Sequence, residues 1–256
     1  GTRFTAIIGV NTLYRLLLDA PGFAKVDLRS LKLAVAGGMA VQHVVAHRWK
    51  ERAGVPLVEG YGLTESAPVA IANPVTVQEW SGQIGVPVPS TEAVILADDG
   101  STAALGQVGE ICLRGPQVMK GYWNQPEESA EVLMPGGWLR TGDMGVMDAQ
   151  GSIRLTDRKK DMIVVSGFKV FPNEIEDVLT MHPDVREAAA IGVHDERSGE
   201  VVKVVVVPNA PTLTEADVLA HCKRHLTGYK VPRVVEFRSE PLPKSSIGKI
   251  LRRELR

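Results

Sequence analysis

Short apolar segments alternate with segments of helical periodicity over residues 1–58. Residues 5–8, 31–36 and 56–58 are apolar and are bounded by polar or turn residues, which predicts three buried strands. Between them, apolar residues recur every three or four positions over residues 12–18 and 41–52, which predicts two helices. Strands that alternate with helices predict a parallel sheet, and ligands of such sheets bind beyond the carboxyl ends of the strands.

The pattern changes near Trp80, where the apolar segments become shorter and lie closer together. They predict strands at residues 93–97, 110–114 and 144–147, and a turn at residues 148–151 that leads into a fourth strand at 153–156. Short strands at close spacing predict a small antiparallel barrel or sheet.

The chain from about residue 160 onward has a pattern of its own. The predicted strands are residues 162–165, 188–193, 201–207 and 234–237. The predicted helices are residues 172–180, residues 214–224, which Thr214 caps with Asp217 three positions on, and a short basic helix at 250–255. This mixture predicts an α+β unit with its own core. The polar run at residues 157–160 predicts the boundary before it.

Composition and charge exclude several classes of protein. The 256 residues are 44% hydrophobic with a net charge of −1, which is typical of a soluble globular protein and does not indicate nucleic-acid binding. Cys112 and Cys222 lie far apart without zinc-type spacing, so a reduced, cytosolic environment is expected. Apolar runs fall short of the ~18 residues of a membrane-spanning helix, and the first residues lack a signal-peptide pattern. The chain starts without methionine directly before a predicted strand, which indicates truncation, with removal of a short leader as the alternative.

Two polar segments in the first part contain candidate chemistry. Gly60 and Gly62 let the backbone approach a ligand, and Thr64 and Glu65 supply oxygens that suit phosphate and Mg²⁺. The alternative is a glycine turn followed by a helix cap. Asp143 follows another predicted glycine turn. Its carboxylate either accepts hydrogen bonds from a ribose diol, as acidic residues do in other nucleotide sites, or simply stabilises the turn.

Two further segments lie in the C-terminal part. Residues 157–169 contain a charged run, an apolar strand and the turn at Ser166-Gly167. This segment is either a solvated run or a charged hinge followed by a turn that passes close to a ligand. Residues 241–253 contain Lys249, which offers a point charge to a phosphate or a carboxylate. The alternative for that segment is a basic chain end without a special function.

The order in which these motifs occur is far more specific than any one of them. The motifs are Tyr61-Gly62-Leu63-Thr64-Glu65, Thr141-Gly142-Asp143, Asp157-Arg158-Lys159-Lys160-Asp161 with Ser166-Gly167, and Pro243-Lys244-Ser245 with Gly248-Lys249. Together they resemble the adenylate-forming family, which includes acyl-CoA synthetases, peptide-synthetase adenylation domains and firefly luciferase. The stretch Gly37-Gly38-Met39-Ala40-Val41-Gln42 and the segment from Glu59 to Pro68 are most similar to bacterial long-chain fatty-acid–CoA ligases.

The resemblance implies a fold, a division into domains and a reaction. Residues 1–157 correspond to the C-terminal part of a large α/β domain, with a parallel α/β layer and a small β-barrel. Residues 158–256 correspond to a small, mobile α+β domain. Enzymes of the family convert ATP and a carboxylic acid to an acyl-adenylate and pyrophosphate. The thiol of coenzyme A then attacks the adenylate, which gives acyl-CoA and AMP.

The resemblance also implies roles for single residues. Tyr61 stacks near the adenine, Thr64 contacts phosphate, Glu65 holds Mg²⁺ and Asp143 binds the ribose hydroxyls. The other residues expected around ATP or AMP are Gly37, Gly38, Met39, Glu59, Gly60, Gly62, Leu155 and Arg158. Lys249 bridges the acyl carboxylate and the α-phosphate, so Lys249, Thr64 and Glu65 are the expected catalytic residues. Lys160 takes the hinge position, and Ser166, Gly167 and Phe168 line the path of coenzyme A.

Some implications stay open at this stage. The family has an upstream Ser/Thr/Gly-rich loop ending in Lys that grips the β- and γ-phosphates. This sequence has no counterpart, so the chain alone is expected not to catalyse adenylation at a useful rate. The alternatives are a medium-chain or aryl acid–CoA ligase and a non-catalytic nucleotide-binding fragment. The expected partners are a fatty acid and coenzyme A. A homodimer and contact with the inner face of the membrane rest on the resemblance alone.

Overall fold

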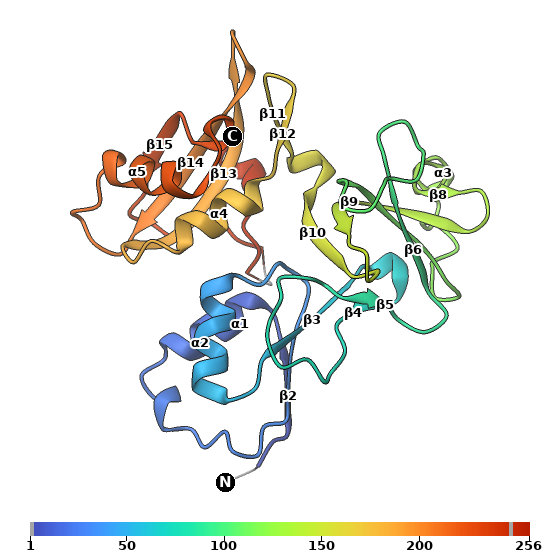
Figure 1. Ribbon diagram of the computed structural model, residues 1–256, viewed down its shortest axis with the longest axis horizontal. Helices are drawn as coiled ribbons and strands as arrows, with labels where there is room; N and C mark the ends of the chain where they lie inside the picture. Colours follow the sequence, from blue (N-terminus) through green and yellow to red (C-terminus); the bar gives the residue numbers. More distant parts are fainter. Residues whose placement is uncertain (1–2, 246–247) are drawn as a thin grey trace. The chain divides into compact units, whose positions relative to one another are not determined.

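The computed structural model describes residues 3–245 and 248–256, and the chain divides into two compact units. The first unit consists of the residues up to 41 together with residues 45–159, and the second of residues 42–44 and 160–256. In Figure 1 the first unit runs from blue to yellow, and residues 160–256 of the second unit run from yellow to red. The sequence predicted a domain boundary after residue 157, whereas the compact units divide after Lys159. The functional boundary stays a prediction.

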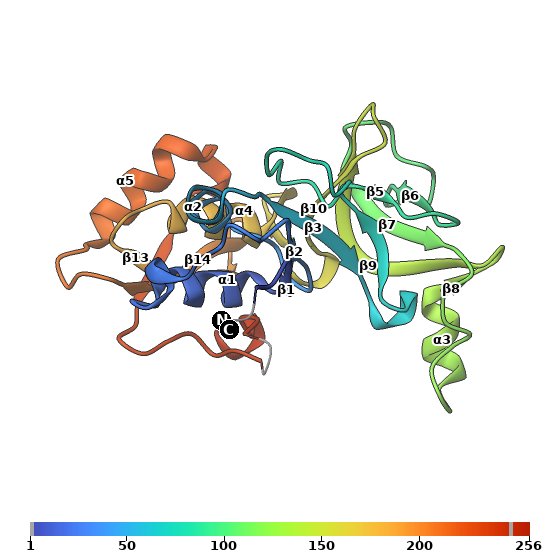
Figure 2. The ribbon, with the colours of Figure 1, turned by 90° about the horizontal axis from the view of Figure 1, so that it is seen from below.

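A five-stranded sheet in the order β1-β2-β3-β4-β5 forms the first layer of the first unit. Its strands are β1 (Ala6–Gly9), β2 (Leu33–Ala36), β3 (Leu57–Gly62), β4 (Val69–Ala72) and β5 (Val86–Pro87). The first three strands are parallel, as the sequence predicted, and β4 and β5 are added in antiparallel pairing. The two predicted helices are α1 (Asn11–Asp19) and α2 (His43–Ala53), which lie beside this sheet in both ribbon views (Figures 1 and 2).

Aromatic side chains fill the space between these helices and the parallel strands. Trp49 of α2 packs edge-on against Tyr14 of α1, with ring centroids 4.6 Å apart, and stacks on Phe23 at 5.8 Å. Tyr14 OH donates a hydrogen bond of 2.6 Å to the carbonyl oxygen of Val35 in β2. Burial raises the pKa of this phenol above its usual range, so it stays a neutral donor. The helical periodicity of the sequence therefore turns the apolar faces of α1 and α2 toward the sheet.

A second, antiparallel sheet in the order β10-β9-β7-β6 completes the first unit, with β8 paired to β9. Its strands are β6 (Glu92–Leu96), β7 (Gly109–Arg114), β8 (Leu133–Met134), β9 (Trp138–Met147) and β10 (Ile153–Arg158), and α3 (Pro126–Val132) precedes β8. The predicted turn joins β9 to β10, and Gly151 N donates to Asp148 O at 3.1 Å. Of the two forms that the short strands predicted, a small barrel or a sheet, the described strands form a sheet.

Two predicted glycine turns are instead parts of strands. Gly60, Tyr61 and Gly62 continue β3, because β4 pairs with them and keeps the backbone extended. Residues 141–143 lie inside β9, where the pairing with β7 passes from Met144 directly to Arg140. Three residues of β9 therefore oppose one residue of β7, which is a β-bulge and not a turn. Local glycine content could not distinguish these cases, since the pairing partners lie far away in the sequence.

The second unit is built on a sheet in the order β12-β11-β14-β13, with β15 parallel to β14. Its strands are β11 (Ile163–Val165), β12 (Phe168–Val170), β13 (Val185–Asp195), β14 (Gly199–Pro208) and β15 (Val234–Phe237), and its helices are α4 (Pro172–Thr180) and α5 (Glu215–His225). The predicted cap of α5 is confirmed: Thr214 Oγ1 accepts a hydrogen bond from Asp217 N at 3.2 Å. The mixed α+β character predicted for this part is confirmed as well.

Both faces of the β13–β14 pair are buried. On one face, Val204 and Val206 of β14 belong to the core that α4 and α5 cover. On the other face, Val205 and Val207 pack with Leu242 and Leu255 of the C-terminal segment. Because successive side chains of a strand point to opposite faces, burial on both faces explains why residues 201–207 are almost continuously apolar.

The short basic helix predicted at residues 250–255 is wrong, apart from one 3₁₀ turn at Arg252–Glu254. Ile250 forms an antiparallel bridge with Lys244, and Leu251 N donates to Pro243 O at 2.9 Å. These bonds hold the backbone in an extended form where a helix would have begun. The contacts of Leu255 with the sheet then decide the path of the last residues.

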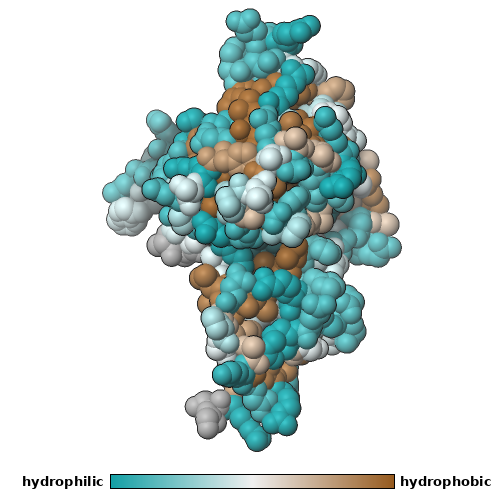
Figure 3. Space-filling model, turned by 90° about the vertical axis from the view of Figure 1, so that its left-hand side faces the viewer, coloured by the Kyte–Doolittle hydropathy of each residue, from teal (hydrophilic) through white to brown (hydrophobic). Residues whose placement is uncertain are grey.

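None of the helices in residues 3–245 and 248–256 is long and apolar enough to cross a membrane. Some large apolar side chains do reach the surface, as the brown patches among the hydrophilic residues show for one face (Figure 3). The most exposed of them are Trp123, Ile8, Val75, Leu105 and Leu16.

Candidate active site

The carboxyl ends of β2 and β3 bring two of the predicted glycine motifs together. Ala36 pairs with Glu59 in the parallel register, so Gly37 and Gly60 follow side by side. A Cβ atom on Gly37 would lie 3.0 Å from the carbonyl oxygen of Gly60, which leaves little room for a larger residue. Gly38 has a φ of +77°, a conformation that favours glycine. Two stretches of bare backbone therefore meet at the edge of the sheet where ligands of such folds bind.

The buried side chain of Glu59 holds the turn after β2 in place. Its Oε1 accepts a hydrogen bond from Val41 N at 3.3 Å, and its Oε2 accepts one from Trp80 Nε1 at 2.6 Å. Met39, also in this turn, accepts a hydrogen bond at its Sδ from Thr12 Oγ1 at 3.4 Å. Glu59 thus supports the Gly37-Gly38 turn from within the protein. The part of Trp80 was not foreseen from the sequence.

Tyr61 and Asp143 form the centre of the candidate nucleotide site. Tyr61 OH donates a hydrogen bond of 2.7 Å to Asp143 Oδ2. Burial, and then the charge of Asp143, raise the pKa of Tyr61 above its usual range, so this phenol remains a neutral donor. Arg158 lies opposite Asp143 in the pairing of β9 with β10, and Leu155 packs against the apolar cluster that contains Tyr61. The structure therefore brings these four predicted residues together.

The bulge that carries Asp143 is fixed by residues that the motifs did not indicate. Thr141 Oγ1 accepts a hydrogen bond from Asp143 N at 3.1 Å. The buried Glu110 accepts one from Gly142 N at 3.2 Å through Oε1, and its Oε2 forms an ion pair of 3.1 Å with Lys159 Nζ. A carboxylate so bonded holds the bulge in one conformation. Only the spatial neighbours reveal this role, because Glu110 is far from Asp143 in the sequence.

Thr64 and Glu65 begin a 3₁₀ helix, Thr64–Ser66, directly after β3. Glu65 Oε1 accepts a hydrogen bond of 2.8 Å from Tyr122 OH, and Glu65 O accepts one of 2.9 Å from Met119 N. The hydrogen bond to Glu65 raises the pKa of Tyr122. Gly62 precedes this segment with no room for a side chain, because a Cβ atom would overlap the carbonyl group of Pro68. Tyr122 is a further residue of the site that sequence reasoning missed.

The donor set near Glu65 fits Mg²⁺ bound together with a nucleotide. In the part of the chain that the structure describes, no group of three or more His, Cys, Asp or Glu side chains is placed to hold a metal ion. Mg²⁺ commonly binds through one or two carboxylates and takes its other ligands from water and substrate phosphates. Glu65 with the neighbouring Thr64 hydroxyl matches that arrangement, and a site made only of protein ligands is not required.

The predicted coenzyme A residues of the second unit form a hairpin turn between β11 and β12. Val165 pairs with Phe168, and the two turn residues Ser166 and Gly167 have φ values of 49° and 85°. Two successive positive φ values are typical of a type I′ turn, so Gly167 is suited to this backbone. Phe168 is 56% exposed and stacks on Tyr229, with ring centroids 4.7 Å apart.

A cavity of about 200 Å³ lies next to this turn. Its walls include Val165, Ser166, Tyr229 and Arg233, so the cavity combines apolar surface, an aromatic ring and a cation. This composition suits a ligand that has both an apolar arm and negative charge.

Lys249 is half-buried on a loop of the C-terminal segment. Lys249 N donates to Ser245 Oγ at 3.2 Å, and Ser245 N donates to Lys249 O at 2.8 Å. Two residues of the motif, Ser246 and Ile247, lie outside the described residues. Lys160, the predicted hinge, is exposed in the 3₁₀ helix Lys159–Asp161. Within the second unit, Lys249 and the Ser166-Gly167 turn thus belong to different segments.

Comparisons with known proteins agree with the motifs and the fold. A family model described as AMP-binding enzyme matches residues 1–123, and one described as AMP-binding enzyme C-terminal domain matches residues 174–249. These two matches confirm the resemblance to adenylate-forming enzymes.

Individual relatives show which enzymes of this kind the chain resembles in sequence. The chain is 57% identical over 253 residues to a long-chain-fatty-acid–CoA ligase of Escherichia coli O157:H7, covering 99% of this chain and 45% of that protein. It is 41% identical to a feruloyl-CoA synthase of an Amycolatopsis species, covering 99% of this chain and 52% of that protein. The similarity to bacterial long-chain fatty-acid–CoA ligases is therefore confirmed. The chain spans about half the length of these relatives.

Solved structures show the same fold. ATP-bound MatB from Rhodopseudomonas palustris is similar with a TM-score of 0.91 and 32% identity, covering 99% of this chain and 50% of that one. The amide bond synthetase McbA from Marinactinospora thermotolerans is similar with a TM-score of 0.89 and 37% identity, covering 99% of this chain and 52% of that one.

Proposed function

We propose that the protein to which this chain belongs joins a long-chain fatty acid to coenzyme A through an acyl-adenylate, with release of pyrophosphate and AMP. The observation that carries the proposal is the cluster at the carboxyl ends of β2 and β3. There Tyr61 binds Asp143 at 2.7 Å, Arg158 lies opposite Asp143, and the bare backbone of Gly37 and Gly60 is adjacent. The long-chain substrate is supported by the names of the relatives that are 53–57% identical.

The cluster has the properties that adenosine recognition needs. A carboxylate has about four lone-pair sites, so Asp143 is able to accept from Tyr61 and from a ribose diol at the same time. The neutral phenol of Tyr61 orients that carboxylate by a hydrogen bond and leaves its negative charge in place. Gly37, Gly38 and Gly60 keep side chains away from the place where the flat base would lie against Tyr61. Met39, Glu59 and Gly62 would help to determine the shape of the nucleotide site.

The phosphates require charge compensation, which Mg²⁺ held by Glu65 and the ammonium group of Lys249 would supply. Glu65, held by Tyr122, would bind Mg²⁺, and the Thr64 hydroxyl would contact a phosphate. When bound, Mg²⁺ lowers the free energy of the negative charge that develops on the phosphates. Lys249 would place its ammonium group between the fatty-acid carboxylate and the α-phosphate, and so allow two anions to approach. Holding both groups in line adds the advantage of proximity.

The second half-reaction requires a different position of the second unit. We propose that Lys160 acts as the hinge of a rotation that removes Lys249 and brings Ser166, Gly167 and Phe168 to the path of coenzyme A. The cavity beside that turn supports the proposal, because Arg233 offers a cation to the phosphates of coenzyme A, and Phe168 and Tyr229 offer aromatic surface.

The isolated chain is expected not to form acyl-adenylates at a useful rate, because its sequence contains no loop that would grip the β- and γ-phosphates. A cytoplasmic location remains a proposal that rests on the sparse cysteines, and peripheral contact with the membrane and a homodimer remain proposals that rest on the family resemblance. An aryl acid as substrate is the second candidate, since the feruloyl-CoA synthase is 41% identical.

The test is a substrate panel with the full-length protein that contains this chain. Palmitate, octanoate and ferulate would each be supplied with ATP, Mg²⁺ and coenzyme A, and AMP and acyl-CoA would be quantified. We expect the highest kcat/KM with palmitate. Preference for ferulate would move the assignment to an aryl acid ligase, and absence of AMP with every acid would contradict the ligase function. Pyrophosphate exchange at a normal rate by this chain alone would contradict the expected inactivity of the chain.

A further inference from the structure

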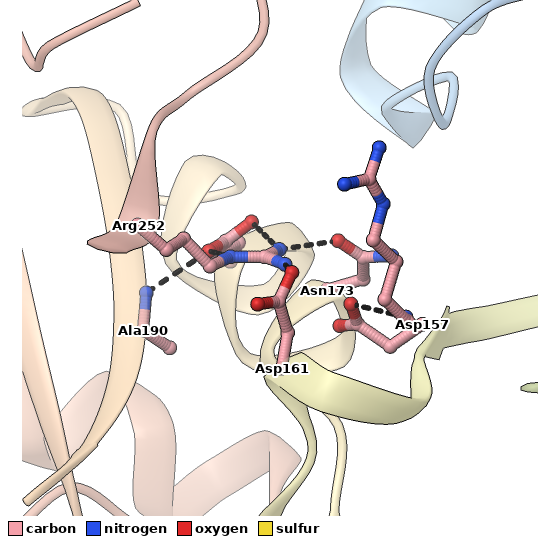
Figure 4. A network of polar contacts seen from close by, with 7 residues as sticks. Asp157, Asp161, Asn173, Ala190 and Arg252 are labelled. Carbon is pink, nitrogen blue, oxygen red and sulfur yellow. Dashed lines mark hydrogen bonds and ion pairs between the residues drawn. The ribbon is translucent and has the colours of Figure 1, made fainter. Parts of the chain in front are cut away.

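Arg252 is the centre of a polar cluster for which the sequence predicted no role (Figure 4). Its Nε and Nη2 bind the two carboxylate oxygens of Glu176 at 2.8 and 2.7 Å. Nη2 also donates to Asn173 Oδ1 at 2.5 Å, and Nη1 lies 3.3 Å from Asp161 Oδ2. We call Arg252, Glu176, Asp161 and Asn173 the Arg252 cluster. A single guanidinium group thus joins the C-terminal segment to α4 and to the residue that follows Lys160.

The Arg252 cluster is shielded from water. The side chains of Arg252 and Glu176 are 11% and 12% exposed. The Glu176 carboxylate also accepts a hydrogen bond from Ala190 N of β13 at 3.0 Å, as Figure 4 shows. A two-pronged Arg–carboxylate pair with further hydrogen bonds is the geometry in which a buried ion pair holds its partners firmly. An ammonium group cannot reproduce it, since the planar fork of the guanidinium serves three acceptors at once.

Arg252, the centre of this cluster, lies three positions after Lys249 in the chain. Between them the backbone is extended, since Ile250 pairs with Lys244 and Leu251 N binds Pro243 O at 2.9 Å. Few torsions therefore separate the fixed Arg252 side chain from the Lys249 backbone.

The other side of the Lys249 loop is anchored separately. The buried Glu187 of β13 accepts hydrogen bonds from Leu242 N at 3.1 Å and from Lys244 Nζ at 2.6 Å. Glu187 thus fixes the segment that enters the loop, and Arg252 fixes the segment that leaves it. Of the two anchors, only Arg252 reaches the residue next to the predicted hinge.

We infer that Arg252 is a positioning residue for Lys249. By binding Glu176, Asn173 and Asp161, it ties the segment from Lys249 to Arg252 to α4 and to the start of the second unit. Rotation at Lys160 then carries Lys249 without loss of its orientation. This inference rests on the proposed function, because it assigns Arg252 to the half-reaction in which Lys249 acts. A displacement of about 1 Å in such a group can cost about 100-fold in rate.

The test separates the two half-reactions in the full-length protein. Arg252→Lys keeps the positive charge and removes the fork, Asn173→Ala removes one acceptor, and Arg253→Ala is the matched control, an exposed arginine one position away. Adenylation is measured by pyrophosphate exchange, and thioester formation is measured from supplied palmitoyl-adenylate and coenzyme A. We expect Arg252→Lys to slow adenylation at least about tenfold and thioester formation less than about twofold. Asn173→Ala should give a smaller loss of adenylation, and Arg253→Ala should leave both rates unchanged.

Other results would overturn the inference. Equal losses in both half-reactions would show that Arg252 only stabilises the fold, and unchanged adenylation in Arg252→Lys would show that the fork is dispensable. If the wild-type protein forms no palmitoyl-adenylate, the proposed function fails, and the inference fails with it. Hydrogen exchange on the full-length protein provides a second readout, in which Arg252→Lys should speed exchange in residues 248–256 while α5 stays protected. Uniformly faster exchange throughout the second unit would again indicate a purely structural role.

Discussion

The candidate residues of the two units are held in place in different ways. In the first unit, Tyr61 and Asp143 lie within strands and are joined by a hydrogen bond between a neutral phenol and a carboxylate. In the second unit, Lys249 lies on a loop, and ion pairs of Glu187 and Arg252 fix the segments on either side of it. Tyr61 and Asp143, which are expected to bind the adenine and the ribose, are therefore part of the sheets, whereas the residue expected to move is on a separately anchored loop.

This difference fits the roles that we propose for the two sites. Recognition of a ribose and a base needs positions that stay constant, and strands with paired neighbours supply them. In the proposed mechanism, Lys249 serves only one half-reaction, so it leaves the site and returns in the same orientation. Ion pairs with several contacts inside one unit preserve that orientation while the unit rotates as a whole.

The largest effect on the rate of adenylation is expected from removing the positive charge of Lys249. Lys249→Ala should reduce adenylation by the full-length protein about 10²–10³-fold, since a positioned charge at developing anions contributes on that scale. AMP affinity should change little, because the adenosine residues belong to the first unit. Lys230→Ala, which removes a lysine paired with Glu174, is the control. Pyrophosphate exchange reports the rate, and an equal loss in both variants would contradict the special role of Lys249.

A smaller effect is expected from removing Asp143, which lies within a strand of the first unit. Asp143→Ala should weaken AMP binding by the full-length protein by about 1.5–3 kcal/mol, the usual contribution of a hydrogen bond to a charged group. Asp99→Ala is the control, because Asp99 sits in an exposed turn where it binds Ser101. Titration calorimetry with AMP measures both variants. Unchanged affinity in Asp143→Ala would remove Asp143 from the ribose site.

Tyr122→Phe tests whether Glu65, the expected ligand of Mg²⁺, also depends on a fixed position. The substitution removes the hydrogen bond of 2.8 Å to Glu65, at an expected cost of about 1 kcal/mol. The Mg²⁺ concentration needed for half-maximal adenylation should then rise about fivefold. Tyr229→Phe, on the other unit, is the matched control. If both variants need the same Mg²⁺ as the wild-type protein, Tyr122 has no part in holding Glu65 for the metal.

The smallest effect concerns the pH dependence of the second unit. Burial, and then the neighbouring Glu176, raise the pKa of Asp177 to about 7. The folded state therefore binds this proton more tightly than the unfolded state, whose carboxyl keeps a pKa near 3.8. The stability contributed by protonated Asp177 is complete below about pH 4 and is lost as the pH rises to about 7.

Asp177→Asn should remove this dependence and raise the stability of the second unit at pH 8 by about 1 kcal/mol. Urea unfolding followed by circular dichroism at pH 5 and pH 8 measures the difference. All four tryptophans lie in the first unit, so their fluorescence serves as an internal control that should not change. A variant with the same pH dependence as the wild-type protein would contradict the shifted pKa.

Local patterns predicted the elements whose cause is local. The capping box of Thr214 and Asp217 was visible because both partners belong to one helical turn. Helix Pro172–Thr180 was likewise predicted from its N-terminal proline and from the acidic residues near its start. The glycines at 60, 62 and 142 were misassigned to turns, because only distant strands decide that they lie in extended backbone.

The candidate site shows the same division. The ordered motifs indicated Tyr61, Asp143 and Lys249 as members of a known family pattern. The residues that orient them were missed, since Trp80, Glu110, Tyr122 and Arg252 act through contacts with residues far away in the sequence. A charged or aromatic residue of this kind looks ordinary until its partner is known.

The sequence by itself indicated the resemblance to adenylate-forming enzymes and the parallel strands with their helices, and it predicted candidate residues for the chemistry. These follow from periodicity and from short motifs, in which every interacting position lies within a few residues. Only the tertiary structure decided that Glu59 supports the glycine turn, that a bulge presents Asp143, and that Arg252 binds the Lys249 segment to α4. Their cause is the pairing of groups from distant segments, which chain folding alone brings within hydrogen-bonding distance.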